Sequence, residues 1–110
     1  MLTEIVHLSE GLAIEGRRYK TAALRAPIVA DSLDVEKESE HKGILYTSIS
    51  LIIKSILEVG DMDKAGNWME RVPKEKITVD AIGTLNEEDL ERLQVARDFL
   101  KKKQSWQRTD

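Results

Sequence analysis

The chain offers few side chains that could carry out catalysis, and they are scattered along it. The two histidines, His7 and His41, are far apart in sequence and neither has a ligand partner close by. Metal ligands and general bases usually stand in a recognisable spacing, so we interpret both as structural residues. The chain has no cysteine, which excludes thiolate zinc sites, iron–sulfur clusters, disulfide scaffolds and cysteine nucleophiles.

The carboxylates and serines also lack the context that catalysis needs. Acidic residues gather within 34–38 and 87–89, and paired acids can act as acid and base when their surroundings separate their pKa values. Both groups fall in predicted helices, which favours solvated helix surfaces. Ser48, Ser50 and Ser55 stand outside any Gly-x-Ser-x-Gly elbow, and no glycine-rich phosphate loop is present. We therefore expect a protein that is not an enzyme and holds no metal or cofactor.

Two basic clusters could contact nucleic acid, but the overall charge argues against it. Arg17 and Arg18 precede Tyr19 and Lys20, and three lysines stand together at 101–103. The chain has 17 basic and 20 acidic side chains, a net charge of −3. Neutralising phosphates needs a basic surface, so we predict solvated charge at both clusters and no nucleic-acid partner.

Composition predicts one globular, soluble domain. The 110 residues are 41% hydrophobic and 34% charged, a balance that fits neither a disordered chain nor a membrane protein. The most apolar stretch, residues 44–59, holds Lys54 and Glu58 and is too short to span a bilayer, which needs about 20 apolar residues. The first four residues do not resemble a signal peptide. We expect a cytoplasmic protein with no membrane contact.

The first 26 residues predict a long β-hairpin. Short apolar runs alternate with polar residues and are separated by Gly11 and Gly16. We place the turn near Gly16 and a bulge or break at Gly11, where a positive φ is useful.

The rest of the chain predicts about four helices. An amphipathic helix follows Pro27, with the proline in its first turn, and ends before Gly43. Isoleucines and leucines recur every three or four residues over 44–57, which indicates a central helix stopped by Gly60. A short helix is expected before Pro73, a single turn capped by Thr78 and closed by Gly83, and a final helix capped by Asn86 with Lys101 to Lys103 at its end.

The predicted fold is therefore α+β: an N-terminal antiparallel β-hairpin followed by a small bundle of about four helices. Residues 1–104 form the single domain, with the hairpin at 1–26 and the helical part at 27–104, and residues 105–110 form a frayed tail. A lone hairpin is marginal in water and needs the helices against one face.

The hairpin gives the main hypothesis about function. If both strands are sheet edges, their unpaired backbone groups invite strand addition by another chain or by a second copy. We therefore name Tyr19, Thr21 and Ala23 as partner-binding candidates. Trp68 and Met69 join them because tryptophan is enriched in interface hot spots, although core packing is the alternative for this pair.

The order of motifs resembles one family of assembly proteins. Ile5-Val6-His7-Leu8-Ser9, then Gly16 and Tyr19, lead into Leu24-Arg25-Ala26-Pro27 and Asp31, and Leu85-Asn86-Glu87-Glu88-Asp89-Leu90-Glu91-Arg92-Leu93 follows near the end. This pattern, over about residues 5–100, is similar to the tail assembly chaperones of Mu-like and P2-like contractile-tailed phages.

The resemblance implies a non-enzymatic chaperone of phage or prophage tail morphogenesis in the host bacterial cytoplasm. Its partners would be the tape-measure protein, whose apolar helices it covers, and the tail-tube subunits that it helps recruit. Homo-oligomers through the hairpin edges are a further expectation. The alternative is a structural or adaptor component retained in the tail particle. A DNA-binding regulator would need a helix with several exposed basic residues, and the predicted helices carry mixed or acidic faces.

Overall fold

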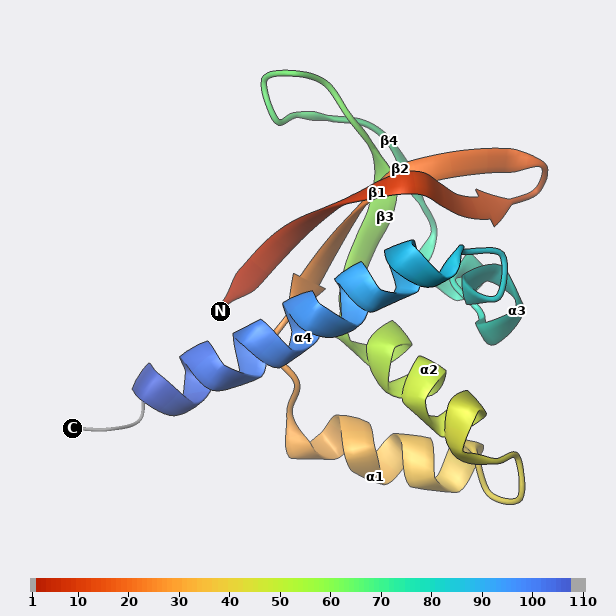
Figure 1. The fold of residues 1–110 in the computed structure, drawn as a ribbon, viewed down its shortest axis with the longest axis vertical. Helices are drawn as coiled ribbons and strands as arrows, with labels where there is room; N and C mark the ends of the chain where they lie inside the picture. The colour runs from red at the N-terminus through yellow and green to blue at the C-terminus, as the bar shows by residue number, and fades with distance from the viewer. Residues whose placement is uncertain (1, 108–110) are drawn as a thin grey trace.

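The computed structural model describes residues 2–107 and has an α+β fold built on a four-stranded antiparallel sheet (Figure 1). The predicted class and the N-terminal hairpin are confirmed, but the rest is not a simple four-helix bundle. The strands follow each other in the order β1-β2-β3-β4. The elements are β1 (Thr3–Ile14), β2 (Arg17–Arg25), α1 (Val29–Glu38), α2 (Ile44–Ser55), β3 (Ile56–Met62), β4 (Trp68–Val72), the 3₁₀ turn η1 (Lys74–Lys76), α3 (Val79–Ile82) and α4 (Glu87–Gln107).

The β1–β2 hairpin has the predicted turn and the predicted break. Glu15 and Gly16, both at positive φ, connect the strands. The regular pairing stops between His7 and Leu12, and Gly11 lies in this interval at a φ of 89°. A Cβ at Gly11 would overlap the backbone carbonyl of Tyr19. Glycine at this position therefore allows both the positive φ and the close approach of β2.

One face of the sheet forms the core. A row of paired residues, Val6, Ala22, Val59 and Val72, crosses all four strands in register. All four are buried in the cluster that also contains apolar residues of α2, α3 and α4. The helices of the C-terminal two thirds thus cover the sheet, and α4 runs across β1 while α1 packs mainly against α2 (Figure 1).

The predicted helix over 44–57 ends early, and this is the largest correction. Helix α2 stops at Ser55 and residues from Ile56 to Met62 form β3. The β-branched isoleucines suit an extended, buried strand as well as a helix face. The Lys74 ammonium group donates to the carbonyls of Ile53 (3.0 Å) and Ile56, where it binds the end of α2.

The short helix expected before Pro73 is also wrong. Trp68 to Val72 form β4, and residues 63–67 form the turn between β3 and β4. The Asp63 carboxylate accepts the amide protons of Ala65 (2.9 Å) and Asn67 (3.0 Å), which fixes this turn. Gly66 supplies its positive φ of 85°.

The remaining helix boundaries agree with their capping residues. The Thr78 hydroxyl accepts the amide of Ala81 at the start of α3, and the Asn86 side chain accepts the amide of Asp89 (2.8 Å) at the start of α4. Two details differ from the prediction. Helix α1 begins at Val29, so Pro27 precedes its first turn.

The other difference concerns the end of α4. The helix continues to Gln107, beyond the lysines at 101–103, so residues 105–107 have helical backbone. Residues 108–110 of that predicted tail lie outside the described residues.

Gly60 provides a test of how β3 and β4 pack. A Cβ at this position would overlap the carbonyl oxygen of Glu70 on β4, so alanine must push the two strands apart. We expect Gly60→Ala to lower the free energy of unfolding by about 2 kcal/mol or more, measured by urea denaturation. Gly83→Ala, where φ is −61° and the nearest atom is 3.2 Å away, is the control and should lose less. Equal losses would contradict the close strand approach.

Candidate polypeptide-binding site

The premise that both hairpin strands are edges is wrong. Strand β2 pairs with β1 on one side and with β3 on the other, so its backbone is not free to bind a further strand. Tyr19, Thr21 and Ala23 all lie on β2 and are buried. The Tyr19 hydroxyl lies 3.5 Å from a Glu70 carboxylate oxygen, within the sheet itself. The edges of the described sheet are β1 and β4.

The other two candidates lie on β4, and β3 separates them from β2. Met69 is 72% exposed, whereas Trp68 is half-buried and has the Arg71 guanidinium 6.0 Å from its ring centre. The five predicted residues therefore do not form one surface. The more distinctive surface lies at the opposite edge, along β1.

The Asp89 carboxylate holds β1 against α4. One of its oxygens accepts the Ser9 amide (2.6 Å) and hydroxyl (3.0 Å), and the other accepts the amides of Glu10 (3.0 Å) and Gly11 (3.0 Å). These amides lie where the β1–β2 pairing is interrupted, so the carboxylate replaces missing sheet bonds. Asp89 is completely buried.

These bonds also decide the charge state of Asp89. Burial by itself raises the pKa of a carboxyl group, but the amides of Ser9, Gly11 and Glu10 and the Ser9 hydroxyl outweigh it. The pKa of Asp89 is lowered to about 2. The buried group is therefore a carboxylate at neutral pH, with its charge distributed over four hydrogen bonds.

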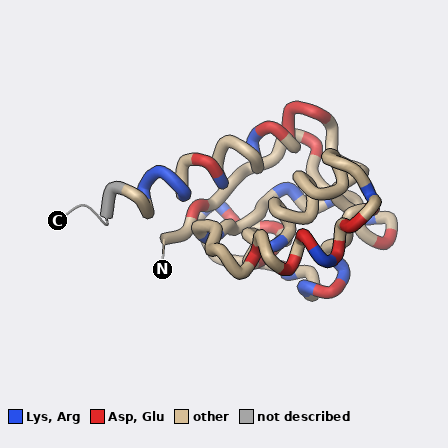
Figure 2. Tube along the Cα trace, turned by 90° about the horizontal axis from the view of Figure 1, so that it is seen from below, with Lys and Arg blue, Asp and Glu red and all other residues tan. Residues whose placement is uncertain are grey.

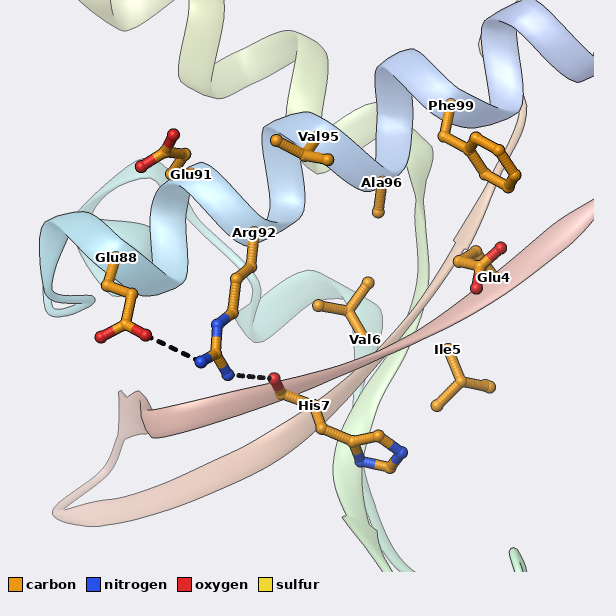
Figure 3. Close-up of a pocket in the computed structure, with 10 residues that line it drawn as sticks. All are labelled: Glu4, Ile5, Val6, His7, Glu88, Glu91, Arg92, Val95, Ala96 and Phe99. Atoms are coloured by element: carbon orange, nitrogen blue, oxygen red, sulfur yellow. Dashed lines mark hydrogen bonds and ion pairs between the residues drawn. The ribbon is translucent and has the colours of Figure 1, made fainter.

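A groove runs between β1 and α4 (Figure 3). This β1–α4 groove has a volume of about 580 Å³. Val6 and Ala96 are buried at its base, whereas Ile5, Val95 and Phe99 are 40%, 58% and 42% exposed. Its lining residues are Glu4, Ile5, Val6 and His7 of β1 and Glu88, Glu91, Arg92, Val95, Ala96 and Phe99 of α4.

Along β1, the backbone N–H and C=O groups of every second residue point toward the groove. The Arg92 guanidinium donates to the His7 carbonyl (2.9 Å), so that carbonyl points away from β2. Backbone groups two residues apart point the same way, which places those of Ile5 and Thr3 at the free edge as well. The Leu2 carbonyl accepts the Ala26 amide, as the opposite alternation requires. Residues 3, 5 and 7 can therefore accept a further strand.

The charges around the groove are unevenly distributed. Three carboxylates line it, those of Glu4, Glu88 and Glu91, and Arg92 is the lining cation. Arg92 is already paired with Glu88 at 2.7 Å. Figure 2 shows the acidic start of α4 and the lysines near its other end, where Lys103 lies 4.7 Å from the Phe99 ring centre. Glu88 and Glu4 lie toward opposite ends of the groove (Figure 3).

Both histidines lie at the surface within the described residues. His7 is exposed on β1, and His41 is exposed in the loop between α1 and α2. Across residues 2–107 no three His, Asp or Glu side chains gather in a way that could hold a metal ion. Among the described helices, none combines the length and hydrophobicity needed to cross a membrane.

Sequence reasoning missed the residues that build this groove. Asp89 belongs to the acidic group at 87–89 that the sequence places on a solvated helix surface, and its contact with residues 9–11 spans about 80 positions that no local pattern reports. Phe99 falls within the predicted final helix, and nothing in the sequence indicates that it lies partly exposed beside β1. The interruption at Gly11 was the available signal, because unpaired amides need an acceptor.

Comparison with known proteins adds no relative. No protein-family model, no curated protein and no solved structure matches this chain. The geometry of the groove and the motifs of the sequence are therefore the basis of any functional proposal.

Replacing Asp89 should weaken the fold in a pH-dependent way. The folded-state pKa of about 2 lies below the ordinary value of 3.8, so the carboxylate stabilises the fold fully above about pH 4. This stabilisation is lost as the pH falls through about 2. We expect Asp89→Asn to lower the free energy of unfolding by about 2–4 kcal/mol at pH 7, with a smaller difference from the parent chain below about pH 3.

Urea denaturation from pH 7 to pH 2 measures this difference. Asp98→Asn is the matched control, because Asp98 is exposed and bonds only the Gln94 side chain among the described contacts. A pH-independent loss for Asp89→Asn, or a loss equal to that of the control, would contradict the assigned role.

Proposed function

We propose that this chain is a non-enzymatic polypeptide-binding protein that adds an extended segment of its partner to the free edge of β1. The observation that carries the proposal is the conjunction of an open strand edge with an apolar groove beside it. Strand addition obtains affinity from main-chain hydrogen bonds and specificity from pockets for alternate side chains. Residues 3, 5 and 7 offer the main-chain hydrogen-bonding groups, and Val95 and Phe99 offer the apolar contacts for side chains.

We further propose that the chain acts as a tail assembly chaperone of a contractile-tailed phage or prophage, in the host bacterial cytoplasm. Its motif order supports this, since it is similar to that of the Mu-like and P2-like chaperones. The partners would be the tape-measure protein and the tail-tube protein. A reversible site with a modest apolar area suits a protein that must release its client as the tube polymerises.

A structural or adaptor role in the finished tail is the second candidate. The same edge could hold a neighbouring subunit permanently instead of a client transiently. Purified tails separate the two roles, because a chaperone is absent from them and an adaptor is present in stoichiometric amounts.

The chaperone proposal predicts copurification with the tape-measure protein of the same phage. Ile5→Pro removes an amide proton at the free edge without removing a β1–β2 bond, so the fold should persist while binding falls about tenfold or more. Affinity copurification after co-expression measures the loss. Ile5→Thr keeps the amide and serves as the control, and circular dichroism checks the fold of both variants.

Two results would contradict the proposal at different levels. Unchanged binding by Ile5→Pro would remove β1 as the binding edge. Failure of the parent chain to retain the tape-measure protein would remove the chaperone role itself.

A further inference from the structure

We infer that the β1–α4 groove selects an extended segment carrying a lysine or arginine, which takes the place of Arg92 beside Glu88. The inference deepens the proposed function and rests on strand addition at β1. The preferred partner strand is apolar toward the middle of the groove and basic at its Glu88 end.

The argument begins with what Arg92 does in the free protein. Its guanidinium donates to the His7 carbonyl at 2.9 Å and pairs with Glu88 at 2.7 Å (Figure 3). The first contact occupies the acceptor that a partner strand needs, in the way that positively charged side chains protect sheet edges. Arg92 must therefore leave His7 before a strand can pair there.

An extended basic segment restores both interactions that Arg92 gives up. Its backbone amide can donate to the His7 carbonyl, and its cationic side chain can pair with Glu88. A neutral or acidic segment restores only the hydrogen bond to His7 and leaves the Glu88 carboxylate without its cation at a partly covered site. Covering that site with an acidic segment would add like-charge repulsion and desolvation.

The rest of the groove requires apolar side chains. Ile5 lies on one face of the strand edge, and Val95 and Phe99 of α4 lie above the other (Figure 3). Side chains of an added strand alternate between these two faces, so apolar residues are favoured on each. At the opposite end the Glu4 carboxylate lies near Phe99 (Figure 3), and Lys103, 4.7 Å from the Phe99 ring centre, already supplies a cation there. The basic residue of the partner is therefore assigned to the Glu88 end, where Arg92 would leave a carboxylate free.

Labelled peptides of about nine residues test this directly. Three versions of one alternating valine–threonine sequence carry Lys, Gln or Glu at a single position, and fluorescence anisotropy gives their dissociation constants for the intact chain. We expect the Lys peptide to bind about threefold to tenfold more tightly than the Gln peptide, and the Glu peptide to bind most weakly. The difference should shrink as salt is added.

Charge reversal on the protein provides the matched comparison. Glu88→Lys should favour the Glu peptide over the Lys peptide, because Glu88 lines the groove and is the carboxylate that Arg92 gives up. Glu36→Lys makes the same charge change on an exposed position of α1 and should leave the original order intact. Arg92→Ala should tighten the Gln peptide, because the competitor for the His7 carbonyl is gone.

The outcomes separate this inference from the proposed function. Equal binding of all three peptides, or weaker binding of all three by Arg92→Ala, overturns the charge selection but leaves strand addition standing. No binding of any peptide overturns strand addition at β1 and the inference with it. A dimer of the free chain that the Lys peptide does not dissociate would place a second copy on β1 and would also overturn the inference.

Discussion

The buried carboxylate of Asp89 connects the N-terminal hairpin with the C-terminal helix α4. Asp89 accepts four hydrogen bonds from residues 9–11, where β1 departs from regular pairing with β2. Without this acceptor the amides would be unpaired, the buried Gly11 amide among them, and the interruption in β1 would be unfavourable. The same contact fixes the start of α4 over β1, so the groove between them depends on it.

Local capping and turn chemistry was readable from the sequence, whereas the competition between helix and strand was not. The Gly16 turn, the Gly11 break, and the Thr78 and Asn86 caps each depend on neighbours within a few residues. The isoleucine-rich run was ambiguous in principle, because β-branched residues three or four apart satisfy a helical period and also fill a buried strand. Pairing of β3 with β2 and β4 decides it, and this pairing is tertiary.

The hairpin does have a free strand edge, but only on β1 and not on β2. Sequence placed the free edge on both hairpin strands, and β3 then occupies the β2 side, which buries Tyr19, Thr21 and Ala23. The sequence of residues 17–25 does not indicate that β3, about 30 residues later, pairs with β2. The α4 side of the groove was equally unpredictable from the sequence. Arg92 and Phe99 fit an ordinary amphipathic helix, and only the position of β1 beside α4 shows that they line a groove.

The separation of about 80 residues between Asp89 and its donors also has a consequence for synthesis. During translation the hairpin leaves the ribosome well before α4 exists, so the interrupted strand has no acceptor for its amides at that stage. Long-range contacts of this kind form late and slow the folding of a small domain. The nascent hairpin therefore stays exposed to other chains until the last helix has emerged, when closure of the domain becomes possible.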